Sequence, residues 1–236
     1  MKVEIWSDIM CPFCYIGKRR FENALQQFPG KEAIEVVWKS FQLNPEMKTE
    51  PDKNINEYLA EKKGWTIDYA KEMSVHVTSM AKEVGLKYDF DKAIVANSFD
   101  AHRLIQLAKA NGKGDEMEER LFKAYFTEGK NIADHATLVQ LGTDIGLAQE
   151  KIKKVLSSHE YADKVEQDIY EAQQIGVRGV PYFVFNDRYA VSGAQASETF
   201  AGALTKAYGE WEKEKPALNE ITGDDGIVCT PEGECN

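Results

Sequence analysis

The sequence has no long apolar run and no excess of basic residues. A membrane-spanning helix needs about 20 consecutive apolar residues, and no stretch of the 236-residue chain approaches that length. The 29 lysines and arginines are outnumbered by 39 acidic residues, which gives a net charge of −10. Nucleic acids and anionic membranes are bound through basic surfaces. We therefore expect no nucleic-acid partner and no membrane partner.

The start of the chain lacks the pattern of a secretory signal. Met1 and Lys2 lead directly into a β-type segment, and acidic Glu4 and Asp8 stand where an apolar segment would have to lie. We therefore expect a cytoplasmic protein. Cysteines are also few, four in all. In a reducing compartment, paired cysteines are more often catalytic, redox-sensing or metal-binding than structural.

Repeats and linker-like stretches are missing as well, and the order of periodic segments indicates an α/β fold. Period-two patterns predict strands over 3–8, 34–43, 182–185 and 189–192, and helices are expected over 15–28 and from 197. Residues 46–56 are polar and predict a loop. Between the second and third predicted strands, apolar residues recur with the period of a helix from residue 55 to residue 175. The helices expected there are 55–63, 68–85, 91–111, 115–128, 134–145, 149–157 and 158–175.

Each β segment is too small to be stable alone. The most economical arrangement is one four-stranded sheet whose two halves are separated by a large all-helical insertion. We therefore expect a split domain made of 1–54 and 176–215, an insertion domain over 55–175, and a tail over 216–236 that carries a second cysteine pair.

The chemistry is concentrated in Cys11-Pro12-Phe13-Cys14, which follows the first strand and opens the first helix. The N-terminus of a helix favours negative charge and hence a thiolate at Cys11. Cys14 lies one turn later, on the order of 5–6 Å away between Cα atoms, which suits a disulfide. Cys11, at the exposed end, would attack a substrate disulfide, and Cys14 would resolve the mixed disulfide. The alternatives are a pair of inert buried thiols or half of a metal site.

The order of these elements resembles the DsbA-like branch of the thioredoxin superfamily. The stretch from Ser7 to Gly17 is most similar to FrnE-like disulfide oxidoreductases. Two further stretches match that group, Asn97-Ser98 with Ala101 to Leu104, and Gly176 to Pro181. The resemblance covers residues 1 to about 210. It implies a thioredoxin-like fold and an enzyme that acts on protein or peptide disulfides and dithiols.

The resemblance also implies a cis-proline beside the dithiol, at Pro181. Because proline has no N–H, Val180 would be left to offer its backbone groups to an extended substrate strand. An ordinary proline at the start of a strand is the alternative. Pro12, Phe13 and His102 complete the expected substrate-binding set, although a lone histidine in a dense helix is more often part of the packing.

Three features refine this expectation. Phe13 stands where periplasmic DsbA has a histidine that stabilises the thiolate, so we predict a less oxidising couple that reduces or isomerises disulfides. Asp8 places a negative charge beside Cys11, or else faces solvent. Cys229 and Cys235 are a second cysteine pair, either an auxiliary redox pair or an incidental tail disulfide.

Two other functions compete with this reading. The 2-hydroxychromene-2-carboxylate isomerases and kappa-class glutathione transferases share the insertion architecture and use glutathione, but they typically carry serine at the position of Cys11. A non-enzymatic zinc protein would use all four cysteines, although the spacing of Cys229 and Cys235 is wider than usual for zinc ligands. We expect no tightly bound cofactor, no metal, and glutathione or another thiol as an electron donor.

Overall fold

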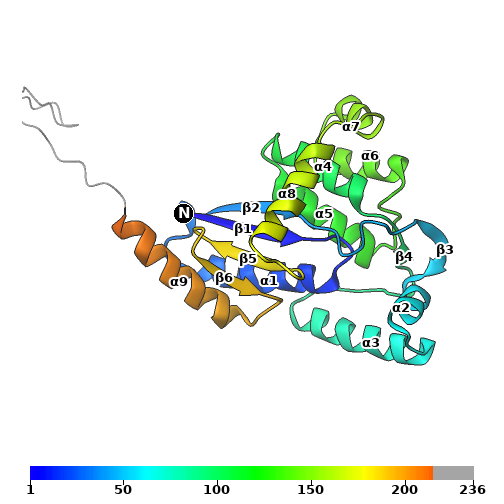
Figure 1. The fold of residues 1–236 in the computed structure, drawn as a ribbon, viewed down its shortest axis with the longest axis horizontal. Coiled ribbons are helices and arrows are strands. Elements are labelled where there is room, and N and C mark those ends of the chain that lie inside the picture. Colours follow the sequence, from blue (N-terminus) through cyan, green and yellow to red (C-terminus); the bar gives the residue numbers. More distant parts are fainter. Residues whose placement is uncertain (215–236) are drawn as a thin grey trace, which may run out of the picture.

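The computed structural model describes residues 1–214, and four of its strands form one mixed sheet (Figure 1). The strands are β1 (Lys2–Ser7), β2 (Glu35–Ser40), β5 (Tyr182–Phe185) and β6 (Tyr189–Ser192), in the order β2-β1-β5-β6. The pair β1–β2 is parallel, and the other two pairs are antiparallel. The predicted fold class, a thioredoxin-like sheet assembled from both ends of the chain with helices inserted between, is confirmed.

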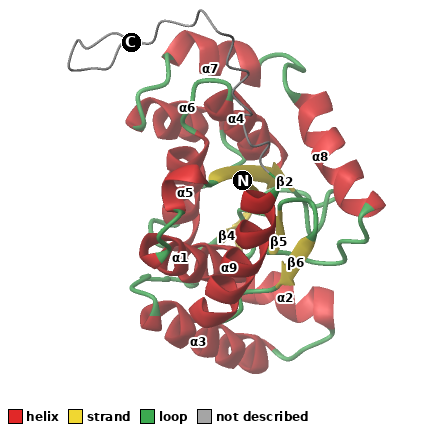
Figure 2. Ribbon diagram, turned by 90° about the vertical axis from the view of Figure 1, so that its left-hand side faces the viewer, coloured by secondary structure: helices red, strands yellow, loops and turns green. Residues whose placement is uncertain are grey.

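Helices cover both faces of this sheet. Helices α1 (Pro12–Gln27) and α9 (Ser197–Lys213) lie together on one face, and α8 (Ala162–Gln174) crosses the other (Figures 1 and 2). On the α1 and α9 side, a cluster of buried aromatic rings fills the space between helices and sheet, formed by Phe21, Phe183, Phe185 and Phe200. Each such ring buries a large apolar area, so this cluster fixes α1 against the sheet.

The segment between the two halves of the sheet is mainly helical. Its helices are α2 (Ile55–Lys63), α3 (Ile67–Glu83), α4 (Phe99–Lys109), α5 (Gly114–Phe126), α6 (His135–Asp144) and α7 (Gln149–Leu156). The largest buried cluster in the protein joins these helices to Cys11, Cys14 and Tyr15 at the start of α1. The dithiol therefore lies where the sheet and the helical segment meet.

Two short strands correct the sequence-based boundaries. Residues expected to form a loop include β3 (Glu50–Asn54), which pairs with β4 (Ile94–Val95). The helix expected from Asp91 begins only at Phe99. The predicted helix started too early because Ile94 and Val95 fit the apolar stripe of a helix as well as they fit a strand. A short apolar run does not distinguish the two. The last helix of the segment begins at Ala162 instead of Ser158, after Tyr161 with a left-handed φ of 67°.

The turn between β5 and β6 is formed by Asn186 and Asp187, residue types that are typical of turns. Asn186 and Asp187 have φ values of 51° and 54°, and Phe185 pairs with Tyr189 across the turn. Asn and Asp tolerate this left-handed conformation better than most residues. The hairpin extends the sheet beyond Pro181, so its position helps to fix the loop that faces the dithiol.

Candidate active site

Strand β1 and helix α1 place the dithiol. After β1 the backbone turns at Asp8, whose carbonyl oxygen accepts a hydrogen bond from the Cys11 N–H at 2.9 Å. Cys11 is the N-cap residue of α1, Pro12 is its first residue, and the Cys14 N–H donates to the Cys11 carbonyl at 3.0 Å. Proline is favoured at this position because the missing N–H would have no helical partner. The Cys11 thiol therefore lies at the positive end of a 16-residue helix.

The two thiols differ in burial, and the structure corrects one expectation. Cys11 and Cys14 are both free thiols, with 4% and 1% of their surface exposed. Cys11 is thus the more accessible of the two but is not the exposed end of the motif. That place belongs to Phe13, which is 38% exposed. Burial raises the pKa of the Cys14 thiol, and the neighbouring Cys11 raises it further.

The loop before β5 closes the site from the other side. The Val180–Pro181 peptide bond is cis, and the Cys11 thiol lies 3.5 Å from the Val180 carbonyl oxygen, to which it donates. Pro181 packs directly on α1 at Gly17, where a Cβ atom would lie 2.9 Å from the Pro181 ring. The structure thus brings together Cys11, Val180 and Pro181. The substrate-binding role of Val180 and Pro181 stays a prediction.

Aromatic residues from the helical segment support the dithiol. The Tyr88 hydroxyl donates to the Pro12 carbonyl oxygen at 2.7 Å, and Tyr15 stacks on Phe122 with ring centroids 4.8 Å apart. Burial and the nearby Cys11 raise the pKa of Tyr88, so its hydroxyl stays a donor. Sequence reasoning missed Tyr88, because no local pattern indicates that residue 88 reaches the start of α1.

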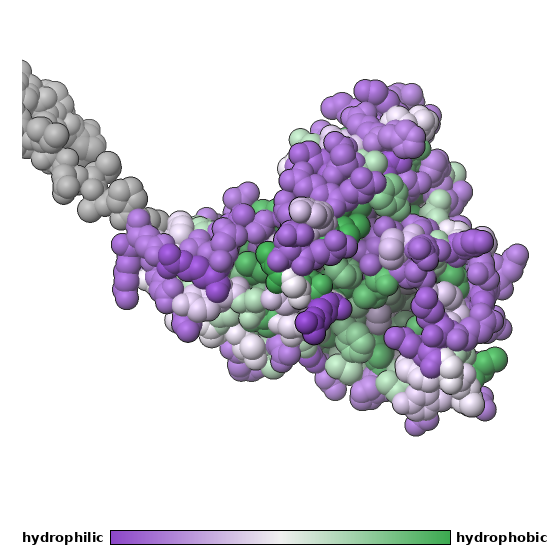
Figure 3. Space-filling view, in the orientation of Figure 1, coloured by the Kyte–Doolittle hydropathy of each residue, from purple (hydrophilic) through white to green (hydrophobic). Residues whose placement is uncertain are grey.

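The surface around the site is apolar. Figure 3 shows apolar side chains gathered in the hollowed middle of the face seen in Figure 1, between α8 and the region of α2 and β3. Phe13 and Leu43 are among the large apolar side chains that remain exposed. Leu43 lies close to the dithiol because its N–H donates to the Asp8 carboxylate at 2.7 Å. Phe13 and Leu43 therefore offer apolar surface beside the dithiol.

Asp8 and His102 lie behind the dithiol, where neither reaches the surface. Each is 1% exposed, and the His102 Nε2 atom is 3.5 Å from the Asp8 Oδ1 atom. The solvent-facing alternative for Asp8 is therefore wrong. A buried His102 also cannot line an open substrate groove over Cys11, so its predicted place in the substrate-binding set does not fit the structure. Both residues instead belong to a buried polar group at the base of the motif.

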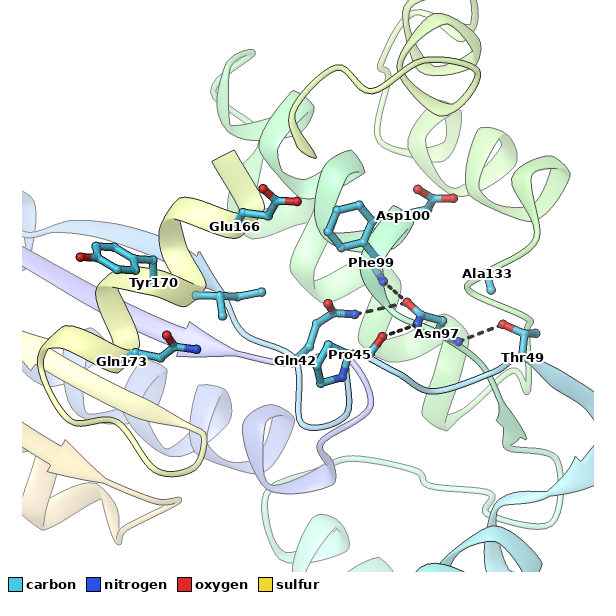
Figure 4. Close-up of a pocket in the computed structure, with 11 residues that line it drawn as sticks. Gln42, Pro45, Thr49, Asn97, Phe99, Asp100, Ala133, Glu166, Tyr170 and Gln173 are labelled. Carbon is cyan, nitrogen blue, oxygen red and sulfur yellow. Dashed lines mark hydrogen bonds between the residues drawn. The ribbon is translucent and has the colours of Figure 1, made fainter. Parts of the chain in front are cut away.

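A pocket of about 730 Å³ lies between α8 and the start of α4 (Figure 4). Asn97 links two other residues that line the pocket. Its Oδ1 atom accepts hydrogen bonds from the Gln42 side chain at 3.2 Å and from the Phe99 N–H at 2.9 Å. Helix α8 lines the pocket with Glu166, Tyr170 and Gln173. Phe41, next to Gln42, packs against the same buried cluster as Val180.

No three histidine, cysteine or acidic side chains of residues 1–214 lie together in a way that could hold a metal ion. No helix of the described part of the chain is long and apolar enough to cross a membrane. Cys229 and Cys235 lie outside the described residues, so neither the auxiliary redox pair nor a four-cysteine zinc site is placed.

Comparison with solved structures gives close matches over nearly the whole chain. A probable DsbA oxidoreductase from Streptomyces coelicolor is 38% identical, covers 100% of this chain and 98% of its own, and superposes with a TM-score of 0.85. A 2-hydroxychromene-2-carboxylate isomerase covers 92% of this chain and 100% of its own at 14% identity, with a TM-score of 0.66.

The cytosolic disulfide reductase DsbM from Pseudomonas aeruginosa, solved with glutathione, is also similar. It covers 91% of this chain and 98% of its own at 16% identity, with a TM-score of 0.60. At 14% and 16% identity, these last two matches bear on the fold alone. The DSBA-like thioredoxin domain family matches residues 2–205. The chain belongs to this family of thiol–disulfide oxidoreductases.

Proposed function

We propose that the protein is a cytosolic thiol–disulfide oxidoreductase and isomerase that acts on polypeptide substrates through Cys11 and Cys14. In this proposal Cys11 attacks a substrate disulfide and forms a mixed disulfide, which Cys14 then resolves. The observation that carries it is the Cys11 thiol at the N-terminus of α1, 3.5 Å from the carbonyl oxygen of the residue before the cis-proline. The FrnE-like subtype remains a prediction from the sequence.

The surroundings of the dithiol support a polypeptide substrate. Val180 offers a backbone segment next to Cys11, so an extended chain can align beside it as an added strand. The exposed side chains of Phe13 and Leu43 give the substrate apolar contacts. The pocket around Asn97 receives substrate side chains that lie farther from the disulfide along the substrate chain. An unfolded polypeptide supplies all three, an extended backbone, apolar side chains and polar groups.

We propose a reducing or isomerising role, with glutathione or another thiol as the electron donor. Phe13 gives the Cys11 thiolate no hydrogen bond and no positive charge, so the reduced form lacks the stabilisation that makes a dithiol strongly oxidising. A cytosolic reductase solved with glutathione shares the fold, which makes glutathione the first electron donor to test.

A turnover assay tests the proposal. The protein should catalyse insulin reduction in the presence of glutathione and should reactivate a substrate with scrambled disulfides. Cys11→Ser should abolish both activities. Cys14→Ser should slow net reduction strongly, because only glutathione is then left to resolve the mixed disulfide on Cys11, while part of the isomerase activity remains. Activity of Cys11→Ser equal to that of the unaltered protein would refute the proposal.

A glutathione-dependent isomerase or transferase is the second candidate, because a 2-hydroxychromene-2-carboxylate isomerase shares the fold over 92% of this chain. The presence of both Cys11 and Cys14 favours dithiol chemistry over it. A glutathione conjugation assay separates the two. Conjugation that persists in Cys14→Ser, together with no insulin reduction by the unaltered protein, would favour this second candidate.

We also propose that Cys229 and Cys235 exchange electrons with Cys11 and Cys14. The support is in the sequence alone, as a second cysteine pair in a protein of redox chemistry. Replacement of both residues by serine should slow recovery of the reduced Cys11–Cys14 pair. Unchanged turnover and an unchanged redox titration would leave the pair incidental.

A further inference from the structure

The pocket between α8 and the start of α4 has a chemistry that disulfide exchange does not by itself use. Its volume of about 730 Å³ is typical of ligand-binding pockets. Its lining combines apolar surfaces with oxygen-bearing side chains, and no lysine or arginine of residues 1–214 lines it. A ligand that offers both apolar surface and hydrogen-bond donors would match this lining.

Gln42 leaves one hydrogen-bond acceptor open in the pocket. The residue is only 9% exposed, and its side chain lines the pocket (Figure 4). The Asn97 Nδ2 atom donates to the Pro45 and Met47 carbonyl oxygens at 3.2 and 2.8 Å. The Asn97 Oδ1 atom therefore receives the Gln42 Nε2 donor at 3.2 Å, and within residues 1–214 the Gln42 Oε1 atom accepts no hydrogen bond. Buried acceptors are nearly always paired, so this oxygen is placed for a donor from a bound molecule.

The charge that faces the pocket is negative. Glu166 and Asp100 both line it, with the Phe99 ring between them in Figure 4. The Asp100 carboxylate is already matched, because it lies 2.8 Å from the Arg103 Nη1 atom and 2.8 Å from the His135 Nε2 atom. Glu166 is exposed and forms no ion pair within residues 1–214. Its charge is therefore available to a ligand.

Apolar surface lies beside these acceptors. Phe99, Ile169 and Tyr170 line the same pocket, and Tyr170 is 60% exposed. Lysine and arginine pack an apolar stem against such a surface while the charged head group keeps polar partners. The face of an aromatic ring also attracts a cation. An acidic side chain would be repelled by Glu166, and a purely apolar side chain would leave the Gln42 oxygen unpaired.

A short hydrogen-bonded path joins the pocket to the dithiol. Gln42 precedes Leu43, whose N–H donates to the Asp8 carboxylate at 2.7 Å. The Asp8 carbonyl oxygen in turn accepts from the Cys11 N–H at 2.9 Å. An extended chain advances about 3.3 Å per residue, so a polypeptide attached to Cys11 can place a side chain in the pocket a few residues from its own cysteine.

We propose that this pocket is a substrate subsite, which takes a lysine or arginine side chain of the polypeptide whose disulfide reacts with Cys11. Glu166 meets the cationic head group, Gln42 accepts one of its N–H donors, and Phe99 with Tyr170 covers the apolar stem. The inference rests on the proposed function and adds a substrate class to it, polypeptides with a basic residue near the reacting cysteine. Glutathione carries a net negative charge and does not match this subsite.

Reduction of short peptides that carry one disulfide tests the subsite. In otherwise neutral peptides, a single lysine is moved through about five positions on either side of one cysteine, and matched peptides carry glutamine or glutamate there. At one or more positions, lysine should raise kcat/KM about fivefold over glutamine, and glutamate should lower it. The preference should shrink at about 1 M salt, which screens an accessible ion pair.

Glu166→Lys should reverse the preference, so that the glutamate peptide exceeds the glutamine peptide and the lysine peptide falls below it. A merely structural effect of the substitution would not reverse the sign. Gln42→Leu should reduce the lysine preference without reversing it, because the charge of Glu166 remains. Glu116→Lys is the matched control, because Glu116 is exposed on α5 and does not line the pocket. It should keep the preference of the unaltered protein.

The absence of a lysine preference at every position would overturn the subsite, and so would a preference that Glu166→Lys leaves unchanged. If Gln42→Leu does not fold, the reversal in Glu166→Lys still decides, since Glu166 is exposed. If the unaltered protein reduces none of the peptides, the proposed function fails instead, so the two failures are distinguishable.

Discussion

At the scale of single residues, we expect Phe13 to set the redox potential of the dithiol. It is the most exposed residue of the tetrapeptide, at 38%, and it cannot donate a hydrogen bond to the Cys11 thiolate. We predict a potential well below the approximately −120 mV of DsbA. Phe13→His should raise it by roughly 30 mV or more, a tenfold change in the equilibrium constant. Equilibration with glutathione measures the potential, with Phe13→Leu as the control that should not shift it.

Glu118 should lower the stability of the fold as pH rises. Its folded pKa of about 7 lies above the ordinary value of 4.5 because the carboxyl is buried. An acid with a raised pKa binds its proton more tightly in the folded state, so stability is lost as pH rises between the two values. The loss should reach about 3 kcal/mol above neutrality.

Glu118→Gln removes this titration, which urea unfolding can detect. The unfolding free energy of the variant relative to the unaltered protein should increase by about 3 kcal/mol from about pH 4 to about pH 8. Equal differences at the two pH values would contradict the raised pKa.

The chemistry could be predicted from local sequence, but the support of the dithiol could not. Cys11 and Cys14 stand at a strand-to-helix junction that a single stretch of sequence shows. Glu118 shares a helix face with the buried Phe122 and Tyr125, so periodicity alone could have marked it as buried. The buried groups that surround it depend on how α5 packs against α1, α4 and β2, and no spacing within one element encodes that.

At the scale of elements, the approach of α1 to the proline loop is the closest fit in the site. Gly17 leaves no room for a side chain, because a Cβ atom would lie 2.9 Å from Pro181. Gly17→Ala should lower the unfolding free energy by about 1 kcal/mol, since a clash costing 1–3 kcal/mol outweighs the gain in helix propensity. It should also reduce insulin-reduction turnover by displacing Pro181 from Cys11.

Gly202→Ala serves as the control for this substitution. Gly202 lies in α9, and a Cβ atom there would meet nothing within 4 Å. This change should stabilise the protein by up to about 1 kcal/mol through helix propensity alone and leave turnover unchanged. A Gly17→Ala protein as stable and active as Gly202→Ala would show that close packing of α1 on Pro181 is not needed.

The ends of helices and strands could be predicted where a turn or capping residue type stands at the boundary itself. Asn186-Asp187 marked the hairpin, and Asn54 and Asp134 cap helices as their residue types suggest. Strand β3 escaped detection because its sequence, Glu-Pro-Asp-Lys-Asn, is entirely polar and contains a proline. Only its pairing with β4 makes it a strand, and a pairing partner 40 residues away in the chain leaves no local pattern.

At the scale of the whole molecule, Asp168 ties the helical segment to the sheet. This residue of α8 is 5% exposed. Its carboxylate accepts from the Ser40 N–H of β2 at 2.9 Å and from the Gln106 side chain of α4 at 2.7 Å, and it lies 3.1 Å from the Lys39 ammonium. A single carboxylate thus joins β2, α4 and α8 on one side of the dithiol.

Asp168→Ala should destabilise the protein by about 2–3 kcal/mol, because the buried Ser40 N–H loses its acceptor and the Gln106 amide loses one of two acceptors, while Lys39 keeps Glu171 and Glu4 as partners. Chemical denaturation measures the loss. Asp163→Ala, an exposed position in the first turn of the same helix, should cost no more than about 1 kcal/mol. Similar losses in the two variants would contradict the joining role of Asp168.

The central claim is that Cys11 attacks the substrate and Cys14 resolves the mixed disulfide, and trapping tests it most directly. Cys14→Ser, reduced and then mixed with a peptide that carries one disulfide, should accumulate a single covalent adduct, and peptide mapping by mass spectrometry should place it on Cys11. The unaltered protein should instead proceed to the Cys11–Cys14 disulfide. An adduct elsewhere in the chain, or none, would contradict the account.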